Sequence, residues 1–483
     1  MSEIELKFQI PAQKHKAFCL AFQRKKPETV QLQAKYFDTA DCCLQQRKIA
    51  LRQRLENHTW MQTLKAPKNA IERLEIESEL GEQEPAAIDL AMYLQDAKLK
   101  KLLEPVLQPQ NPLQLQFETR VQRQRFIQKI ADSEIELAFD QGEIIAGQRS
   151  APVNEIEFEL KQGSIHALIQ SVQPWVEKYQ IWLDSSSKAL KGQMLQQALQ
   201  AAPVQYQSSL ALHADDHVGA ALAKIIANCL EHLLPNSSAI AGQQYEAGHV
   251  HQARVAIRRM RSALKTFGQW AGRDTQAWQD QLAELFRQLG ATRDRDALAA
   301  SLIPQLQLAG SPVSELPAQA EAVEEDISAL FRAPKTTLLL LELIEFSHQP
   351  QDGKSRLKKQ SRKQLNKMHQ QICQAESAFE QLQAEEKHRL RKRVKRLRYS
   401  VEFIASLYPQ SAMKPYLKAL KPLQESLGRF NDLTVAQALF EKSVSQQPQS
   451  WFVLGWIAAE QHHIEQQIQQ ELTAFCQAQC FWK

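Results

Sequence analysis

The first residues of the chain combine side chains that could bind a metal ion and a phosphate. Residues 3–8 read Glu-Ile-Glu-Leu-Lys-Phe, with charged and apolar residues in strict alternation. On a β-strand, Glu3, Glu5 and Lys7 would share one face. Two carboxylates and an ammonium group on one face are costly without compensation, which a divalent cation together with an anionic phosphate would provide. A solvated edge strand would carry the same pattern, so the rest of the N-terminal half must decide.

The same alternation returns in later segments. Charged or polar residues share one face at Arg52 and Arg54, at Thr63 and Lys65, at Arg73, Glu75 and Glu77, at Arg123 and Arg125, and at Glu155, Glu157, Glu159 and Lys161. Any one such strand would usually turn its charged face to water. Together they place charge of both signs on almost every strand, which favours a barrel with a charged lumen. A barrel of about eight strands has room for one ligand.

The elements that would position these residues are short strands. Eight strand-like segments with short turns between them predict an antiparallel barrel. They are residues 3–9, 33–39, 47–55, 59–65, 72–80, 115–127, 133–140 and 153–161. Helices are expected at residues 11–25 and 86–104 and again within residues 164–200. In the last region, three serines at residues 185–187 are good N-cap residues just before Lys188.

Taken in order, these motifs resemble the CYTH domain of the triphosphate tunnel metalloenzyme superfamily. The resemblance implies an eight-stranded tunnel that processes triphosphates with magnesium or manganese. Nine motifs carry it: Glu3-x-Glu5-x-Lys7, Tyr36-Phe37-Asp38-Thr39, Leu51-Arg52-x-Arg54, Thr63-Leu64-Lys65, Arg73-x-Glu75-x-Glu77, Arg123-x-Arg125, Asp140-Gln141-Gly142, Glu155-x-Glu157-x-Glu159 and Ser187-Lys188.

The resemblance also implies roles for the lumen residues. Phosphate would be bound by Lys7, Arg52, Arg54, Lys65, Arg73, Arg123, Arg125 and Lys188. Mg²⁺ or Mn²⁺ would be held by Glu3, Glu5, Glu157 and Glu159, with Glu75, Glu77 and Asp140 completing the acidic side. The expected catalytic residues are Glu3, Glu5, Lys7, Arg52, Arg54, Lys65 and Lys188. Lys188 matches a family lysine that reaches the tunnel, although an ordinary first-turn lysine would look the same.

The C-terminal half reads as helices. It contains an internal repeat, in which His251-x-x-Arg254-x-x-x-Arg258-x-x-Arg261 returns as His388-x-x-Arg391-x-x-x-Lys395-x-x-Arg398. These spacings fall on one face of a helix. Two such stripes predict an all-α domain of two pseudo-symmetric helical bundles. We therefore expect a tunnel domain at residues 1–200, a linker at 201–209 and a helical domain at 210–483.

The repeat resembles the CHAD domain, which implies binding of inorganic polyphosphate through the eight repeat residues. Each repeat is followed by a second motif, Leu289-Gly290-x-x-Arg293-Asp294 and Leu427-Gly428-x-x-Asn431-Asp432. Asn431 stands where the first repeat has Arg293, so the second half is expected to bind anions less tightly or to differ in shape. Basic helices often bind nucleic acid, but base-stacking aromatic residues are nearly absent here apart from Tyr399. Polyphosphate is therefore favoured over nucleic acid.

Composition limits the remaining possibilities. The chain has 59 Lys and Arg against 54 Asp and Glu, so anion binding must come from clustering rather than from net charge. Its seven cysteines include no C-x-x-C motif, which fits a reducing compartment and argues against a disulfide framework. Charged residues near the start exclude a signal peptide there, and the apolar runs 338–341 and 451–459 are too short to cross a membrane. A cytoplasmic location is expected.

The expected function is hydrolysis of tripolyphosphate to pyrophosphate and phosphate, beside a polyphosphate-binding domain. Two alternatives stay open at this point. One is a nucleotide-processing tunnel enzyme, namely a nucleoside or thiamine triphosphatase or a class IV adenylate cyclase. The other is a non-catalytic polyphosphate-binding scaffold, which the intact set of carboxylates disfavours. Alternation places no aromatic pair in the lumen to stack a base, so tripolyphosphate is expected to be preferred over ATP.

Overall fold

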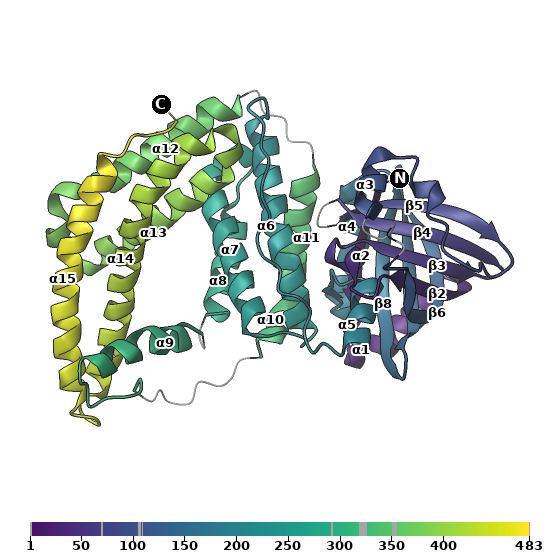
Figure 1. Cartoon of the computed structure of the whole chain (residues 1–483), viewed down its shortest axis with the longest axis horizontal. Helices are drawn as coiled ribbons and strands as arrows, with labels where there is room; N and C mark the ends of the chain where they lie inside the picture. The colour runs from purple at the N-terminus through teal and green to yellow at the C-terminus, as the bar shows by residue number, and fades with distance from the viewer. Residues whose placement is uncertain are drawn as a thin grey trace. The chain divides into compact units, whose positions relative to one another are not determined.

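The computed structural model describes residues 2–68, 71–104, 108, 110–290, 293–317, 326–349 and 355–482. The chain divides into two compact units. The first comprises Met1–Gln207, Cys229–Ala256 and Ile327–Gln349, and the second comprises Ser208–Asn228, Ile257–Asp326 and Pro350–Lys483. Strands occupy the N-terminal part of the chain and helices the remainder (Figure 1).

The N-terminal part is an antiparallel sheet, as predicted. Its strands are β1 (Ser2–Gln9), β2 (Glu28–Asp38), β3 (Ala50–Glu56), β4 (Thr59–Pro67), β5 (Glu72–Gly81), β6 (Gln114–Ile130), β7 (Ser133–Ala146), β8 (Arg149–Gln162) and β9 (Trp182–Leu183). They follow the order β5-β4-β3-β2-β6-β7-β8-β1-β9. A further pairing of β1 with β5, from Ser2 opposite Leu74 to Ile4 opposite Glu72, joins the eight longer strands into a ring.

Strand register places the predicted lumen residues on one face. Opposite one another lie Lys7 and Glu157, Glu5 and Glu159, Arg123 and Asp140, Asp140 and Glu155, Arg52 and Thr63, Thr63 and Glu77, and Lys65 and Glu75. Directly opposed residues of neighbouring antiparallel strands point to the same side of the sheet. The charged residues of different strands therefore form one continuous inner surface.

Two helices cover the outer, apolar face of the barrel. They are α1 (Ala12–Gln23) and α4 (Ile165–Tyr179). Phe18 lies 5.1 Å from Trp175 and 5.2 Å from Phe139, measured between ring centroids. The helix expected at residues 11–25 is thus confirmed. The one expected at 86–104 is wrong in extent, since the segment forms only a 3-10 turn (Ala91–Tyr93) and the short helix α3 (Ala97–Leu103).

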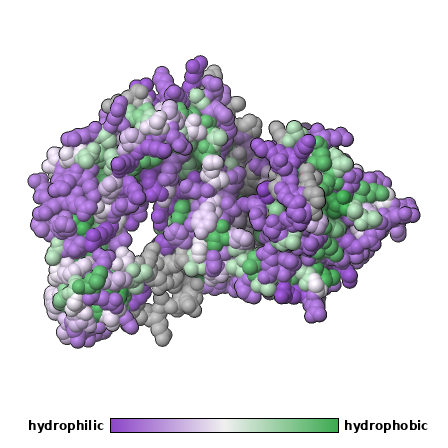
Figure 2. All heavy atoms as spheres, viewed as in Figure 1, coloured by the Kyte–Doolittle hydropathy of each residue, from purple (hydrophilic) through white to green (hydrophobic). Residues whose placement is uncertain are grey.

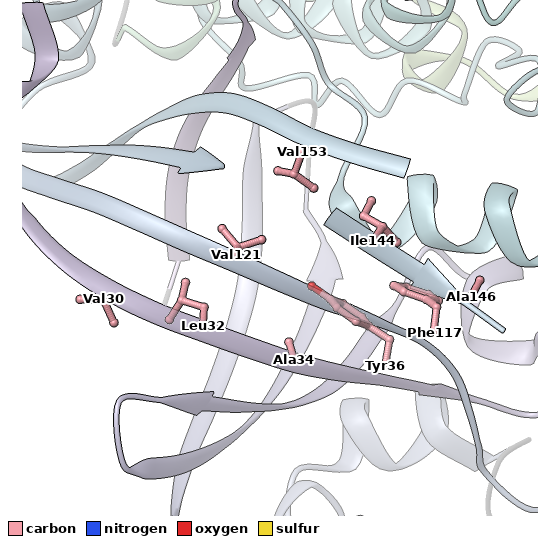
Figure 3. Close-up of a cluster of buried hydrophobic side chains, with 9 residues drawn as sticks. All are labelled: Val30, Leu32, Ala34, Tyr36, Phe117, Val121, Ile144, Ala146 and Val153. Atoms are coloured by element: carbon pink, nitrogen blue, oxygen red, sulfur yellow. The ribbon is translucent and has the colours of Figure 1, made fainter. Parts of the chain in front are cut away.

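A third helix, α5 (Lys188–Gln197), lies against the inner face. An apolar cluster continues this face beyond the charged residues (Figure 3). It consists of Val30, Leu32, Ala34, Tyr36, Phe117, Val121, Ile144, Ala146 and Val153. Ala189 and Leu195 of α5 pack on this cluster. A Cβ atom added to Gly192 would lie 2.2 Å from Cε2 of Phe117, so a side chain at residue 192 would prevent this approach.

The rest of the chain is helical, as predicted. The helices are α6 (Val218–Ala241), α7 (Ala247–Phe267), α8 (Gln276–Gln288), α9 (Arg293–Leu308), α10 (Ile327–Arg332), α11 (Pro334–His348), α12 (Leu357–Cys373), α13 (Ala384–Phe403), α14 (Gln410–Ser443) and α15 (Ser450–Cys476). Within the first unit, α11 lies against α4, and Nδ1 of His166 is 2.7 Å from Oε1 of Glu345.

Two features bear on the expected cellular context. Among the described residues, α6 is long and apolar enough to cross a membrane, but 72% of its apolar window is buried, as in the core helix of a folded domain. Hydrophilic residues cover most of the face seen in Figure 2. Cys373 and Cys476 form a disulfide between the ends of α12 and α15, contrary to the expectation from cysteine spacing. They are 103 residues apart, so spacing in the sequence could not reveal the pair.

Candidate functional site

A cavity of about 810 Å³ lies inside the barrel. Most of the predicted site residues line it, namely Glu5, Lys7, Arg52, Arg54, Lys65, Glu75, Glu77, Arg123, Arg125, Glu157, Glu159 and Lys188. The side chains of Glu3 and Arg73, also predicted for this site, lie outside the described residues. The barrel thus brings cations and carboxylates from at least seven strands and from helix α5 to one space.

The most buried part of the site is a group of three carboxylates around one ammonium group. Nζ of Lys188 lies 2.6 Å from Oδ2 of Asp140 and 2.7 Å from one oxygen each of Glu155 and Glu157. Asp140 and Glu155 are 0% and 1% exposed. Arg123 donates two hydrogen bonds of 2.7 Å to Asp140 and a third to Glu157. Strands β6, β7 and β8 therefore converge on the end of α5.

The electrostatic balance of this group favours the charged forms of Glu157 and Lys188. Burial would raise the pKa of Glu157, but Lys188 and Arg123 outweigh burial and hold this pKa well below its usual range. Burial opposes the charge of Lys188 as well, yet Asp140 and Glu155 raise the pKa of its ammonium group. Lys7 differs, because burial lowers its pKa in spite of the nearby Glu155. The cluster is thus a set of paired charges that water barely reaches.

A second layer of polar residues supports this cluster. Nζ of Lys191 lies 2.9 Å from both Glu155 and Asp184. The side-chain amide of Gln9 donates to the same two carboxylates, at 3.1 Å and 2.9 Å. Reasoning from the sequence left all four residues out of the site. Glu155 had a signal in its strand alternation and Lys191 in its position one turn after Lys188, whereas nothing in the sequence marked Asp184.

A second group of charges lies on β3, β4 and β5. Lys65 is 3.0 Å from Glu75, and Arg54 is 3.3 Å from Glu77. Thr63 donates a hydrogen bond of 2.9 Å to Glu77. The structure thus pairs two predicted acidic residues with two predicted phosphate-binding cations.

Further ion pairs involve residues of β2, β3, β6 and β8. Lys161 is 2.6 Å from Glu159, whose neighbour across the strands is Glu5. Arg125 is 3.2 Å from Glu28 and 3.1 Å from Glu56. Ligand binding would therefore require cations and carboxylates to exchange partners.

The lumen also contains an aromatic pair, which contradicts the expectation from alternation. The rings of Tyr36 and Phe117 are stacked with centroids 4.5 Å apart, and Tyr36 lines the cavity. Tyr36 lies opposite Phe117 in regular register, and the pairing of β2 with β6 shifts only beyond this pair, between Tyr36 and Phe37. The alternation that places Arg123 in the lumen therefore also places Phe117 there. Burial lowers the pKa of Arg52, but the hydroxyl of Tyr36 and Glu75 outweigh burial and raise it.

The deep carboxylates suit a divalent cation. Asp140, Glu155 and Glu157 each offer an oxygen atom, and these atoms lie within 4.8 Å of one another. Mg²⁺ and Mn²⁺ prefer such oxygen ligands. Two of the three residues belong to the predicted metal set, and Glu155 is new. Because Lys188 contacts all three carboxylates, a metal would compete with its ammonium group.

The predicted polyphosphate-binding residues are divided between the two units. His251 and Arg254 belong to the first unit, and Arg258, Arg261, His388, Arg391, Lys395 and Arg398 belong to the second. In the second unit, burial together with the nearby Arg391 and Arg258 lowers the pKa of Lys395 to about 8. Nδ1 of His388 lies 2.9 Å from Oδ1 of Asn431, the residue that interrupts the repeat.

The fold and the lumen together define a class of protein. It has a tunnel-like antiparallel barrel with a charged interior, followed by a helical region. This chain belongs to the family that joins a CYTH domain to a CHAD domain. The CYTH domain model matches residues 1–192, and the CHAD domain model matches residues 224–441.

The chain is also similar to individual proteins. An inorganic triphosphatase from Haemophilus influenzae is 32% identical over 202 residues, which are 40% of this chain and 55% of that protein. The chain therefore spans about half the length of this curated relative. A crystal structure of the CHAD domain from the plant Ricinus communis is 32% identical, with 58% of this chain and 99% of that chain covered and a TM-score of 0.44. A Hippeastrum protein, described as a candidate adenylyl cyclase with dominant triphosphatase activity, is 20% identical over 39% of this chain and 94% of that chain, with a TM-score of 0.27.

Proposed function

We propose that the barrel is the active site of a metal-dependent inorganic triphosphatase that hydrolyses tripolyphosphate to pyrophosphate and phosphate. One observation carries the proposal most directly. Seven predicted phosphate-binding cations, Lys7, Arg52, Arg54, Lys65, Arg123, Arg125 and Lys188, line one cavity together with Glu157, one of the three carboxylates that could hold a metal ion. A non-catalytic scaffold would have no need for that acidic set inside an anion-binding cavity.

The chemistry required is mainly positioning and neutralisation of charge. A water molecule attacks a terminal phosphorus, the phosphoanhydride bond breaks, and pyrophosphate leaves. Arginine side chains such as Arg52 and Arg54 would make forked contacts with phosphate oxygens, and Lys65 would act as a point charge. Mg²⁺ or Mn²⁺, held by Asp140, Glu155 and Glu157, would supply further positive charge at the phosphate oxygens and would lower the pKa of a bound water.

The exchange of ion partners would let the lysines of the deep cluster bind carboxylates in one state and phosphate in the other. Without ligands, Lys188 neutralises the carboxylates at 2.6–2.7 Å. When a cation occupies those carboxylates, the same ammonium group becomes available to a phosphate oxygen. Each charge would then keep a partner in both states, which avoids the large cost of an unpaired buried charge.

We also propose that the second unit contributes to binding long-chain polyphosphate. The support is the concentration of cations around Lys395, where Arg391, Arg258 and Arg398 act on the same ammonium group. Charge reversal of Arg258 and Arg391 together should weaken polyphosphate binding more than reversal of Lys358 and Lys363, with a strong dependence on salt. Equal losses would indicate only a diffuse basic surface, and tighter binding of RNA would favour a nucleic-acid function.

A nucleotide-processing enzyme is the second candidate, and the Tyr36 ring in the cavity wall is the observation that favours it. Phe117 covers one face of that ring, however, and Gly192 packs on Phe117. A nucleoside triphosphate also carries an ester where tripolyphosphate has a terminal anion. Losing one charge-assisted contact costs about 1.5–3 kcal/mol, or roughly a ten- to hundredfold change.

The deciding experiment compares three substrates with the same enzyme. Phosphate release from tripolyphosphate, ATP and thiamine triphosphate should be measured side by side with Mg²⁺ and with Mn²⁺. We expect kcat/KM for tripolyphosphate to exceed that for ATP by at least about tenfold. An equal or higher value for ATP would place the nucleotide-processing function first, and phosphate release from none of the three would leave the scaffold or an adenylate cyclase, which releases pyrophosphate from ATP.

A further inference from the structure

The turn between β9 and α5 determines where three lysines of the site lie. The backbone N–H of Asp184 donates a 2.8 Å hydrogen bond to the carbonyl of Lys7, and the Lys7 ammonium group donates to the carbonyl of Ser186. Ser187 caps the helix that begins with Lys188, its hydroxyl accepting from the N–H of Leu190 at 3.1 Å. A displacement of this turn would therefore move Lys7, Lys188 and Lys191 together.

Helix α6 holds the turn from the side opposite the barrel. The hydroxyl of Ser238 accepts a 2.9 Å hydrogen bond from the N–H of Ser185 and lies 3.1 Å from the hydroxyl of that residue. Leu234, one helical turn earlier on the same face, lines the cavity itself. Ser238 is 4% exposed, so water does not replace this hydrogen bond. All these residues belong to the first compact unit.

A second contact fixes the same region. The guanidinium group of Arg332 donates a 2.6 Å hydrogen bond to the carbonyl of Ala241, the last residue of α6. The same group lies 5.8 Å from the ring centroid of Trp182 in β9. Ser238 and Arg332 both belong to the segment that matches the CHAD domain model. They thus contact both ends of the stretch from Trp182 to Ser185.

We propose that Ser238 is a positioning residue of the triphosphate site. It acts through the N–H of Ser185 and sets the turn that places Lys188 among the carboxylates. This inference rests on the proposed triphosphatase function for its catalytic readout. Under this proposal, residues of the segment that matches the CHAD domain model help to form the tunnel site, in addition to any ligand that this segment binds itself.

The test is Ser238→Ala in the full chain, with Ser237→Ala as its matched control. Ser237 lies beside Ser238, is equally buried, and donates its hydroxyl to the carbonyl of Leu234 in its own helix. Ser238→Ala should lower kcat for tripolyphosphate about five- to tenfold and raise KM by a similar factor, because one buried hydrogen bond that orients the turn is lost. Ser237→Ala should leave kcat within about twofold. Ser238→Thr, which keeps the hydroxyl, should restore most of the loss.

Three results would distinguish a positioning role of Ser238 from a general loss of protein stability. In the Lys188→Met background, Ser238→Ala should cause little further loss of kcat, since both changes act through the same ammonium group. Ser185→Ala keeps the N–H donor and should cost less than Ser238→Ala. Melting temperatures of the two serine variants should agree. Full additivity with Lys188→Met, or equal kcat for Ser238→Ala and Ser237→Ala, would overturn the proposal.

The proposal can also be tested if the wild-type chain hydrolyses no triphosphate. Binding of tripolyphosphate in the presence of Mg²⁺, measured by calorimetry, does not require turnover. Ser238→Ala should then weaken this binding about fivefold or more relative to Ser237→Ala. Failure of hydrolysis with this difference intact would reject the proposed activity alone, whereas equal affinities would reject the positioning role.

Discussion

At the scale of single residues, the site is a network in which every strong charge of the deep cluster has an opposite charge beside it. Lys188 is the centre of this network, with three carboxylate oxygens within 2.7 Å. Because the pKa values of Glu155 and Glu157 are held below their usual range, these carboxylates stabilise the folded state above the pKa of the unfolded chain, about 4.3. That contribution is lost as the pH falls through the lowered values.

Lys188→Met should therefore destabilise the protein in a pH-dependent way. We expect the free energy of unfolding to fall by on the order of 3 kcal/mol at pH 7, because three buried carboxylates lose their common partner. Their pKa values rise in the variant, so the deficit should shrink between pH 7 and pH 5 as they take up protons. Urea unfolding at both pH values measures this.

The control for this variant is Lys129→Met. Lys129 is 75% exposed and pairs with Glu134 on the same barrel, so its loss should change stability little at either pH. A deficit in Lys188→Met that is equal at pH 7 and pH 5 would contradict the assigned network.

Metal dependence is the second prediction at this scale. Activity should disappear in excess EDTA and return with Mg²⁺ or Mn²⁺. Glu5→Ala should abolish turnover with little change in melting temperature, because removing one carboxylate beside Glu159 relieves repulsion between like charges. Glu134→Ala, in the β6–β7 hairpin, should keep its activity. Full turnover of the wild type in EDTA would remove the metal assignment, and full turnover of Glu5→Ala would remove Glu5 from the predicted metal set.

At the scale of elements, α5 connects the apolar and charged parts of the lumen. Its first residue carries the central ammonium group, and its Gly192 allows the helix to touch Phe117. Phe117 in turn stacks on Tyr36, next to Arg52. The position of one short helix therefore affects both groups of residues that are predicted to bind phosphate.

Gly192→Ala tests the contribution of this close approach. The new methyl group would lie 2.2 Å from the Phe117 ring, so α5 or the ring must move. Overpacking of this kind costs about 1–3 kcal/mol, from which about 1 kcal/mol of helix propensity is regained. Activity should fall more than stability, because Lys188 moves with the helix. Adding Phe117→Leu should recover part of the activity.

Gly455→Ala provides the matched comparison for helix propensity. Gly455 lies within α15, and a Cβ atom added there meets nothing within 4 Å. That substitution should stabilise the chain by up to about 1 kcal/mol. If Gly192→Ala behaved like Gly455→Ala in both stability and activity, close packing of α5 would have no functional importance.

Sequence patterns are informative where the structural property that they report is local. Alternation is a local property, so the strands and the lumen face of residues such as Arg52 and Glu157 were predictable. The bulge at Tyr36, the approach of Gly192 to Phe117 and the Ser185–Ser238 contact depend on segments far apart in the sequence. Asp184 lies in a turn with no periodic pattern, and for that reason nothing marked it as part of the site.

At the scale of the whole molecule, two anion-binding regions are predicted in one chain. The first is the barrel cavity, and the second is the group of cations around Lys395 in the second unit. A region that concentrates long polyphosphate would raise the local supply of phosphoanhydride substrate for a tunnel on the same chain. The two regions should respond differently to pH, because most cations of the barrel are paired with carboxylates while Lys395 lies among other cations.

The pH dependence of polyphosphate binding provides the test. Burial and the neighbouring arginines lower the pKa of Lys395 to about 8, so the ammonium group is charged at pH 7 and mostly neutral at pH 9. Affinity of the full chain for long-chain polyphosphate should therefore fall as the pH rises through 8. Lys395→Arg should bind equally well at both pH values, since a guanidinium group stays charged. Titrations at constant ionic strength at pH 7 and pH 9 measure this. If Lys395→Arg kept the full pH dependence of the wild type, a different group would be responsible, and Lys395 would lose its assigned place in the binding region.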